Sequence, residues 1–238
     1  MTKESAKHMR EMEFMTTMLT NEVRAEKASV MCYRSKDNTY ETTTVSSKGK
    51  ILLYSGAEKR DAVAKALVER IRKTDKGHID TGIFGTRYIG DVLCDLGEVD
   101  LLIDMHSQKN YPGFGYMFEQ GATTLWEQWA FRGIMHSHNH AMMSGAASWL
   151  YTHLAGLRPA KHGYREILVK PCFPKAVDSV SLERDTPYGT VAVGWRRIAS
   201  GIKVTVTTPK NVSGTLCLPG RKDLKLPPGE TPVVELRN

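Results

Sequence analysis

The spacing of hydrophobic residues changes near Pro159, and this change constrains the fold more than any other feature of the chain. Before Pro159, apolar residues recur three and four positions apart, which is the period of a helix with one buried face. After it, they alternate or form β-branched runs, which is the period of a strand. The sequence therefore predicts an α+β multidomain chain, in which helices come first and an antiparallel β-sandwich follows.

Three segments follow from this pattern. Residues 1–50 are an N-terminal segment with one helix over about 4–27 and a polar loop after it. Residues 51–158 form the helical domain, and residues 159–238 form the β-sandwich.

The helical domain is expected to hold about five helices. The first begins near Ala57, the second spans 82–96 and stops at Gly97, and the third runs from Val99 to just before Tyr111. The fourth begins near Thr124 and the fifth spans 139–155. The side chains expected to face inward are Val63, Ala66, Leu67, Ile71, Ile89, Val92, Leu93, Leu96, Val99, Leu102, Ile103, His106, Met142, Ala146, Trp149 and Leu150.

In the β-sandwich, strands are expected over 165–170, 190–195 and 201–207. Turns are expected at Tyr188-Gly189 and at Ala199-Ser-Gly201, because these small and flexible residues separate alternating runs.

Composition excludes several classes of protein. The formal charge is +7, but no block of Lys and Arg with interleaved aromatic residues suggests a nucleic-acid groove. No apolar run approaches the ~20 residues of a membrane span. The N-terminus lacks the apolar region of a signal peptide, so a cytoplasmic location is expected. The four cysteines are widely spaced and are expected to be free thiols.

The stretch most suggestive of chemistry is centred on Glu127, which lies between Trp126 and Trp129. A segment rich in aromatic residues and glycine, Tyr111-Pro-Gly-Phe-Gly-Tyr116, precedes it, and a His/Asn segment, Met135-His-Ser-His-Asn-His-Ala141, follows it. Carbohydrate sites combine these residue types, because sugar rings stack on aromatic rings while carboxylates, His and Asn bind hydroxyls. A carboxylate in such a site can also act as an acid or a base at a glycosidic bond.

Each of these residues also has a structural interpretation. Thr124-Leu-Trp-Glu127 matches a capping box, and from spacing alone this role for Glu127 is favoured over chemistry. The aromatic side chains could pack in the core instead of against a sugar. His136, His138 and His140 suggest a metal, but no nearby carboxylate or cysteine completes a ligand set, so no metal or other cofactor is expected. His78 and Asp80 are expected to cap the second helix.

Several stretches resemble the α-L-rhamnosidases of glycoside hydrolase family 78. They occur in the family's order over roughly residues 60–220, and the Gly-Ala-Thr-Thr-x-Trp-Glu run is the most specific of them. The matching stretches are 77–86, 111–117, 121–127, 139–140, 149–157 and 163–164. The resemblance covers the C-terminal part of the family and implies an (α/α)6 barrel, of which this chain carries about half, followed by a β-sandwich.

The resemblance also implies roles for individual residues. Glu127 matches the general base that activates water in an inverting hydrolysis, and His140, in Asn139-His140, matches a position that hydrogen-bonds the sugar. Asn139 is also a candidate for binding the substrate, as are four aromatic residues: Trp126, Trp129, Phe114 and Tyr116. The chain departs from the family pattern at two places. The family usually has Ser-Trp where this chain has Gly113-Phe114, and it commonly has Asp where this chain has Ala130.

The family's general acid lies in an upstream motif, and nothing in residues 1–60 resembles it. The expected function is therefore an α-L-rhamnosidase-like glycoside hydrolase in truncated form, acting on a rhamnose-containing glycoside. The alternatives are a non-catalytic sugar-binding remnant and a metal-dependent hydrolase. No nucleic-acid or membrane partner is expected. A homo-oligomer or a partner chain is expected to cover the open side of the half-barrel.

Overall fold

The computed structural model describes residues 33–34, 39–40, 60–132 and 137–237. The chain forms two compact units, Met1–Gly85 and Thr86–Asn238, and the boundary between them falls inside helix α3 (Ile83–Asp95). The helix predicted over about 4–27 lies outside the described residues, as does His136. Within the described part of the chain, no helix is long and apolar enough to cross a membrane.

The first unit is built on helix α2 (Arg60–Glu69), which continues into a π-helical segment, η2 (Arg70–Thr74). A short antiparallel pair, β1 (Tyr33–Arg34) and β2 (Thr39–Tyr40), is also described there. Leu67 and Ile71 are buried as predicted, since residues four apart share one face of a helix. Ala66 is exposed, so its predicted inward position is wrong, and Val63 lies outside the described side chains.

A turn after η2 is held by one arginine. Arg70 donates hydrogen bonds to Asp75 at 3.3 Å and to Asp80 at 3.4 Å. Ile79, between these two acidic residues, is fully buried. The carboxylate of Asp80 therefore pairs with Arg70, whereas the cap predicted for His78 and Asp80 stays a prediction.

The second unit contains most of α3, from Thr86 onward, followed by α4 (Val99–Ser107) and α5 (Phe114–Glu119). Gly97 ends α3 with φ +78°, as predicted, because glycine adopts this left-handed conformation without strain. The predicted inward residues Ile89, Leu93, Val99 and Leu102 are buried. Val92, Leu96 and Ile103 are only partly buried. Helix α5 was not predicted.

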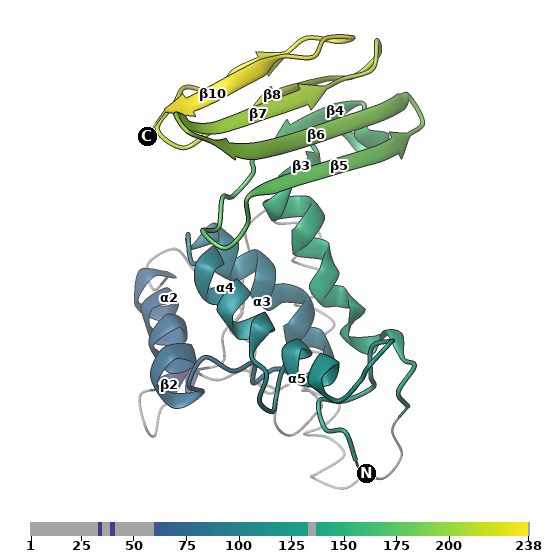
Figure 1. Ribbon diagram of the computed structural model, residues 1–238. Coiled ribbons are helices and arrows are strands. Elements are labelled where there is room, and N and C mark those ends of the chain that lie inside the picture. Colours follow the sequence, from purple (N-terminus) through teal and green to yellow (C-terminus); the bar gives the residue numbers. More distant parts are fainter. Residues whose placement is uncertain (1–32, 35–38, 41–59, 133–136, 238) are drawn as a thin grey trace, which may run out of the picture. The chain divides into compact units, whose positions relative to one another are not determined.

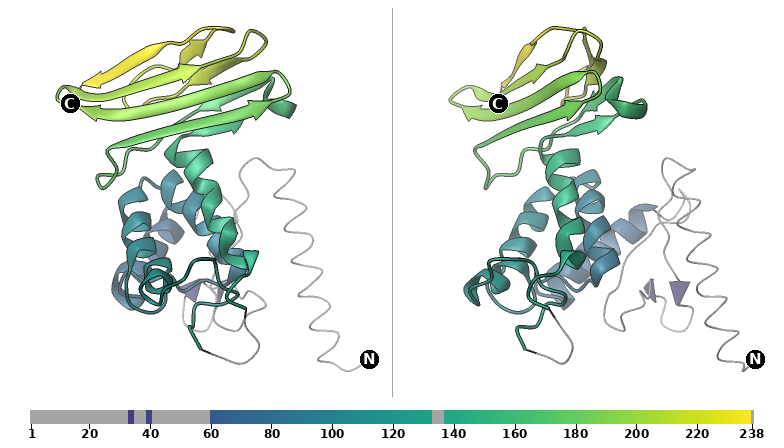
Figure 2. Two further views of the ribbon diagram at one scale, coloured as in Figure 1. Left: turned by 45° about the vertical axis from the view of Figure 1, so that its right-hand side comes forward. Right: turned by 90° about the vertical axis from the view of Figure 1, so that its right-hand side faces the viewer.

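Residues 141–154 are helical but irregular, and they lie alongside α3 (Figures 1 and 2). A 3-10 segment, η3 (Ala141–Ala147), leads into a π-helical segment, η4 (Leu150–Leu154). Thr86 of α3 contacts Met143, and Asp91, later in α3, contacts Thr152. Helix α3 and the helical segment 141–154 therefore run in the same direction.

This irregularity explains one wrong prediction. Ala146 and Trp149 are buried as expected, but Leu150 is 42% exposed. The chain changes from 3-10 to π winding at this point, so a constant period of 3.6 residues does not identify the buried face. Met142 lies outside the described side chains.

Two four-stranded sheets make the β-sandwich (Figure 2). One has the order β10-β7-β6-β5 and the other the order β3-β4-β8-β9. The strands are β3 (Leu157–Pro159), β4 (Glu166–Val169), β5 (Ser179–Thr186), β6 (Gly189–Ile198), β7 (Gly201–Thr207), β8 (Ser213–Leu216), β9 (Leu224–Leu226) and β10 (Val233–Arg237). The predicted strands and both predicted turns are confirmed. The pairing is antiparallel throughout except between β4 and β8, which are parallel.

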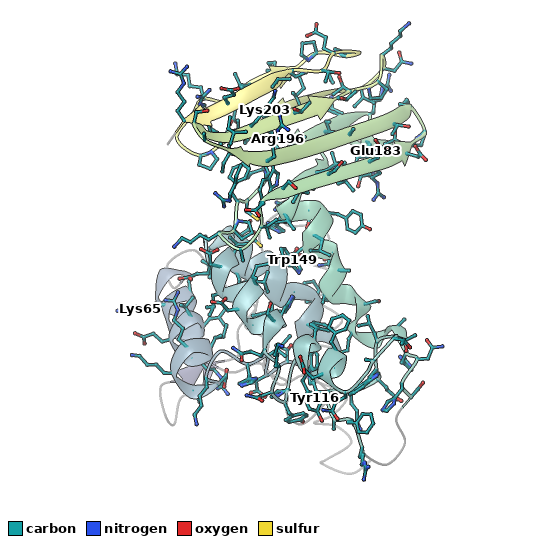
Figure 3. The ribbon with its side chains drawn as sticks, in the orientation of Figure 1. Lys65, Tyr116, Trp149, Glu183, Arg196 and Lys203 are labelled. Carbon is teal, nitrogen blue, oxygen red and sulfur yellow. The ribbon has the colours of Figure 1, made fainter. Side chains whose placement is uncertain are left out.

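The sandwich core follows the alternation of its strands. Val191, Val193 and Trp195 of β6 and Val204 and Val206 of β7 are buried between the sheets. The intervening residues face outward, and Figure 3 labels Arg196 of β6 and Lys203 of β7 among them, together with Glu183 of the neighbouring strand β5. A shallow hollow of about 390 Å³ lies on this outer face around Gly194. It shares no residue with the segment around Glu127.

Candidate active site

The segment that carries Glu127 is not helical. Residues 122–132 have no regular secondary structure, and Glu127 forms two hydrogen bonds with a residue ten positions later. The Glu127 N–H donates to the Ser137 carbonyl at 2.9 Å, and the Ser137 N–H donates to Glu127 Oε2 at 2.9 Å. The predicted helix near Thr124 and its capping box are therefore wrong, because a partner distant in sequence binds the carboxylate.

The His/Asn segment lies beside the Glu127 segment. The His140 N–H donates to the Leu125 carbonyl at 2.8 Å, and the Thr124 hydroxyl donates to the His138 carbonyl. The Ser137 hydroxyl and the Asn139 N–H are 3.0 Å apart and tighten the turn between them. These backbone contacts place the segment of Asn139 and His140 next to that of Glu127, as a shared site requires.

Among the described residues, the Glu127 carboxylate accepts a hydrogen bond at only one of its two oxygens. Oε2 accepts the hydrogen bond from Ser137, while Oε1 accepts none from any residue that the structure describes. The side chain is half-buried. A general base needs this combination, since it must keep a fixed direction and still have a lone pair available for a proton.

The two tryptophans that flank Glu127 anchor its segment. Trp126 is 2% exposed and Trp129 is 9% exposed, so both rings pack inward. One face of Trp126 stacks on His138, with ring centroids 4.5 Å apart and an interplanar angle of 19°. His138 is fixed in turn, because its Nε2 lies 2.9 Å from the Phe131 carbonyl.

The other aromatic candidates lie around these tryptophans. Phe114, at the start of α5, meets the Trp129 ring edge to face at 5.0 Å. The ring centroid of Tyr116, which is labelled in Figure 3, lies 6.3 Å from that of Trp126 and 5.6 Å from that of Tyr111. Phe114 and Tyr116 are half-buried, whereas Tyr111 is 54% exposed. The structure thus gathers the predicted aromatic residues in one cluster, and their contact with a sugar stays a prediction.

His106 belongs to the same cluster but was predicted only as an inward residue of α4. Its ring lies 5.1 Å from Phe114 and 5.9 Å from Trp149. Nε2 is buried and has no hydrogen-bond partner among the described residues. Burial disfavours the charged form and lowers the pKa of His106 to about 4. The ring is therefore neutral at neutral pH.

Two further contributors were not among the predicted catalytic or substrate-binding residues. Ser137, which holds Glu127, is one polar residue in a polar segment, and only its backbone makes the contact. His138 stacks on Trp126, although its own side chain is exposed. Within the described part of the chain, no group of three His, Cys, Asp or Glu side chains is arranged to hold a metal ion.

The fold and this site together define a class of protein. Helices of a partial toroid, a following β-sandwich and a half-buried carboxylate among aromatic rings are typical of the glycosidases built on helical hairpins. Residues 12–154 match the bacterial alpha-L-rhamnosidase 6 hairpin glycosidase domain, and residues 156–231 match the bacterial alpha-L-rhamnosidase C-terminal domain. The chain belongs to this family of bacterial α-L-rhamnosidases.

Individual relatives agree with this assignment. An alpha-L-rhamnosidase from Formosa agariphila is 33% identical over 171 residues, which are 68% of this chain and 18% of the relative. The alpha-L-rhamnosidase structure from Dictyoglumus thermophilum matches 71% of this chain and 19% of its own, with 34% identity and a TM-score of 0.67. The Streptomyces avermitilis alpha-L-rhamnosidase complexed with L-rhamnose matches 68% of this chain and 16% of its own, with 30% identity and a TM-score of 0.63. The chain thus spans about a fifth of the length of these relatives.

Proposed function

We propose that this chain is an α-L-rhamnosidase-type glycoside hydrolase module in which Glu127 is the general base. The observation that carries the proposal is the state of its carboxylate: Ser137 binds Oε2, and Oε1 accepts no hydrogen bond from the residues that the structure describes. Family membership and the relative complexed with L-rhamnose support a rhamnose-containing glycoside as the substrate.

In this mechanism Glu127 removes a proton from a water molecule as that water attacks the anomeric carbon. The attack comes from the face opposite the leaving oxygen, so the configuration inverts. The base and the acid of such a site are ~6.5–9.5 Å apart, which leaves room for the water. No acid is assigned within this chain, so protonation of the leaving oxygen depends on a group still to be identified.

The test uses a substrate that does not need the acid. A dinitrophenyl α-L-rhamnoside has a leaving group that departs without protonation, so its hydrolysis reports on the base. We expect the full chain to release dinitrophenolate and Glu127→Gln to lose at least about 100-fold in rate, as general bases contribute about 10²–10⁴. Gln retains a carbonyl oxygen for the Ser137 N–H, so the loop conformation is kept.

The matched control is Glu119→Gln. Glu119 lies at the end of α5, is exposed and pairs with Lys109 at 2.9 Å, so its loss should leave the rate unchanged. Equal rates for wild type and Glu127→Gln would refute the assignment of the base. No turnover by the wild-type chain would refute hydrolysis by this chain alone, and L-rhamnose binding followed by tryptophan fluorescence would then test the sugar-binding alternative.

A further inference from the structure

Two of the cysteines lie where the helical part of the second unit meets its β-sandwich. Cys94 is on the last turn of α3, and Cys172 follows β4 in the segment that leads to β5. Both are free and half-buried. Each thiol is the largest influence on the pKa of the other, which indicates that the two side chains lie next to each other. Thiols this close can be joined by oxidation if the segments that carry them are held in place.

The segment of Cys172 is fixed from both sides. The Cys172 N–H donates to the His153 carbonyl at 2.9 Å, and the Lys175 N–H donates to Asp100 Oδ1 at 2.7 Å. From the β-sandwich, Arg197 donates to the Phe173 carbonyl at 3.1 Å and to the Pro174 carbonyl at 2.8 Å. Contacts with η4, α4 and β6 thus hold this segment in one place.

Cys94 is fixed through the same histidine. His153 Nε2 lies 3.2 Å from Asp91 Oδ1, and Asp91 precedes Cys94 by three residues on α3. The Thr152 hydroxyl donates to the same oxygen at 3.3 Å. His153 therefore contacts the helix of Cys94 with its side chain and the backbone of Cys172 with its carbonyl, so one residue aligns the two cysteines.

The surrounding charges make the two thiols unequal. The hydrogen bond to Cys172, burial, and the carboxylates of Asp91 and Asp95 raise the pKa of Cys94. The hydrogen bond from Cys94 lowers the pKa of Cys172, burial opposes this, and Arg158 adds to the lowering. Cys172 is thus the better nucleophile, since the thiolate is the reactive form.

We propose that Cys94 and Cys172 are a site of reversible oxidation, at which an intramolecular disulfide fastens α3 to the segment between β4 and β5. With hydrogen peroxide, the Cys172 thiolate attacks one oxygen, the O–O bond breaks, and a sulfenic acid and hydroxide form. The Cys94 sulfur then attacks the sulfenic sulfur and displaces its oxygen as water. In total, two thiols and one peroxide give one disulfide and two waters, with two electrons passing from sulfur to oxygen.

The experiment uses the full chain with Cys32→Ser and Cys217→Ser, which leaves only the proposed pair. After treatment with a slight excess of hydrogen peroxide, we expect a mass loss of 2 Da, a crosslinked peptide that joins Cys94 to Cys172, and recovery of both thiols with dithiothreitol. The thermal midpoint should rise by roughly 5 °C or more, because the crosslink closes a long loop.

The control adds Cys94→Ser to this background. It should form no crosslink, should gain oxygen at Cys172, and should show no rise in the thermal midpoint after oxidation. Two thiols that remain open to alkylation in the folded background variant after peroxide would overturn the proposal, as would a crosslink that forms only between chains. In the wild-type chain Cys217 is an internal comparison, because burial raises its pKa to about 11 and should make it react more slowly.

Discussion

Acid should destabilise this protein through His106, and the size of the effect can be worked out from its surroundings. The pKa of His106 is about 4 in the folded chain, against an ordinary value of 6.5. Below pH 6.5 the unfolded chain takes up a proton that the folded chain does not bind. Stability from this residue is therefore fully present above pH 6.5 and is lost as the pH falls toward 4.

The magnitude follows from the difference between the two pKa values. A difference of one in pKa corresponds to about 1.4 kcal/mol, so the loss between pH 7 and pH 4 is about 3 kcal/mol. Proteins of this kind have total stabilities of about 5–15 kcal/mol, so this loss should be easy to measure.

The assay compares wild type with His106→Leu, in which an apolar side chain replaces a ring whose Nε2 has no hydrogen-bond partner among the described residues. Urea unfolding is followed by tryptophan fluorescence, which reports on this site because the Trp149 ring lies 5.9 Å from His106. Other groups also titrate, but they are common to both proteins. We expect the free energy of unfolding of wild type, relative to the variant, to fall by about 3 kcal/mol between pH 7 and pH 4. If the difference in the free energy of unfolding between wild type and His106→Leu does not change with pH, this reasoning is refuted.

Three further predictions concern packing. In thermal melts, Gly156→Ala should destabilise the protein strongly and Gly220→Ala only slightly. Both glycines have positive φ, but an added Cβ would lie 2.3 Å from the Lys170 carbonyl carbon at Gly156 and would meet nothing within 4 Å at Gly220. Trp195→Phe should lower the free energy of unfolding by about 1–3 kcal/mol, because the Leu154 carbonyl loses the indole N–H that donates to it at 2.8 Å. A loss below about 0.5 kcal/mol would contradict this role of the hydrogen bond. Phe118 is 74% exposed, so Phe118→Asp should reduce the apparent mass in light scattering if this apolar residue is covered by another chain, and an unchanged oligomer would argue against that interface.

The regular parts of the fold were predictable because local patterns determine them. Strand β7 begins at Gly201 and ends at Thr207 as predicted, since its β-branched residues alternate between a buried and an open face. Helix α3 lies within one residue of its predicted bounds, because an apolar stripe and the glycine at 97 define it.

The failures share a physical cause, which is that distant contacts override local preference. Thr124 to Glu127 has the sequence of a helix start, but Ser137 binds both the N–H and the carboxylate of Glu127. Helix α5 was missed because Gly113 and Gly115 suggest a loop. A Cβ on Gly115 would lie 2.6 Å from the Ser107 carbonyl oxygen, so this glycine allows α5 to approach the end of α4.

The candidate site was predictable in its members but not in its geometry. The residue types around Glu127 indicated a carbohydrate site, and the family resemblance indicated the role of the carboxylate. The stacking of His138 on Trp126 and the burial of His106 Nε2 arise only when separate segments meet. No spacing in the sequence encodes these contacts.

Chemical rescue tests the role of Glu127 most directly. In Glu127→Ala, azide can enter the space of the carboxylate and attack the anomeric carbon without giving up a proton, so it needs no base. We predict that azide restores release of dinitrophenolate from the dinitrophenyl α-L-rhamnoside and that the sugar product is the β-L-rhamnosyl azide, of inverted configuration. A variant that stays inactive with azide, while wild type is active, would contradict Glu127 as the base and leave it only a structural role.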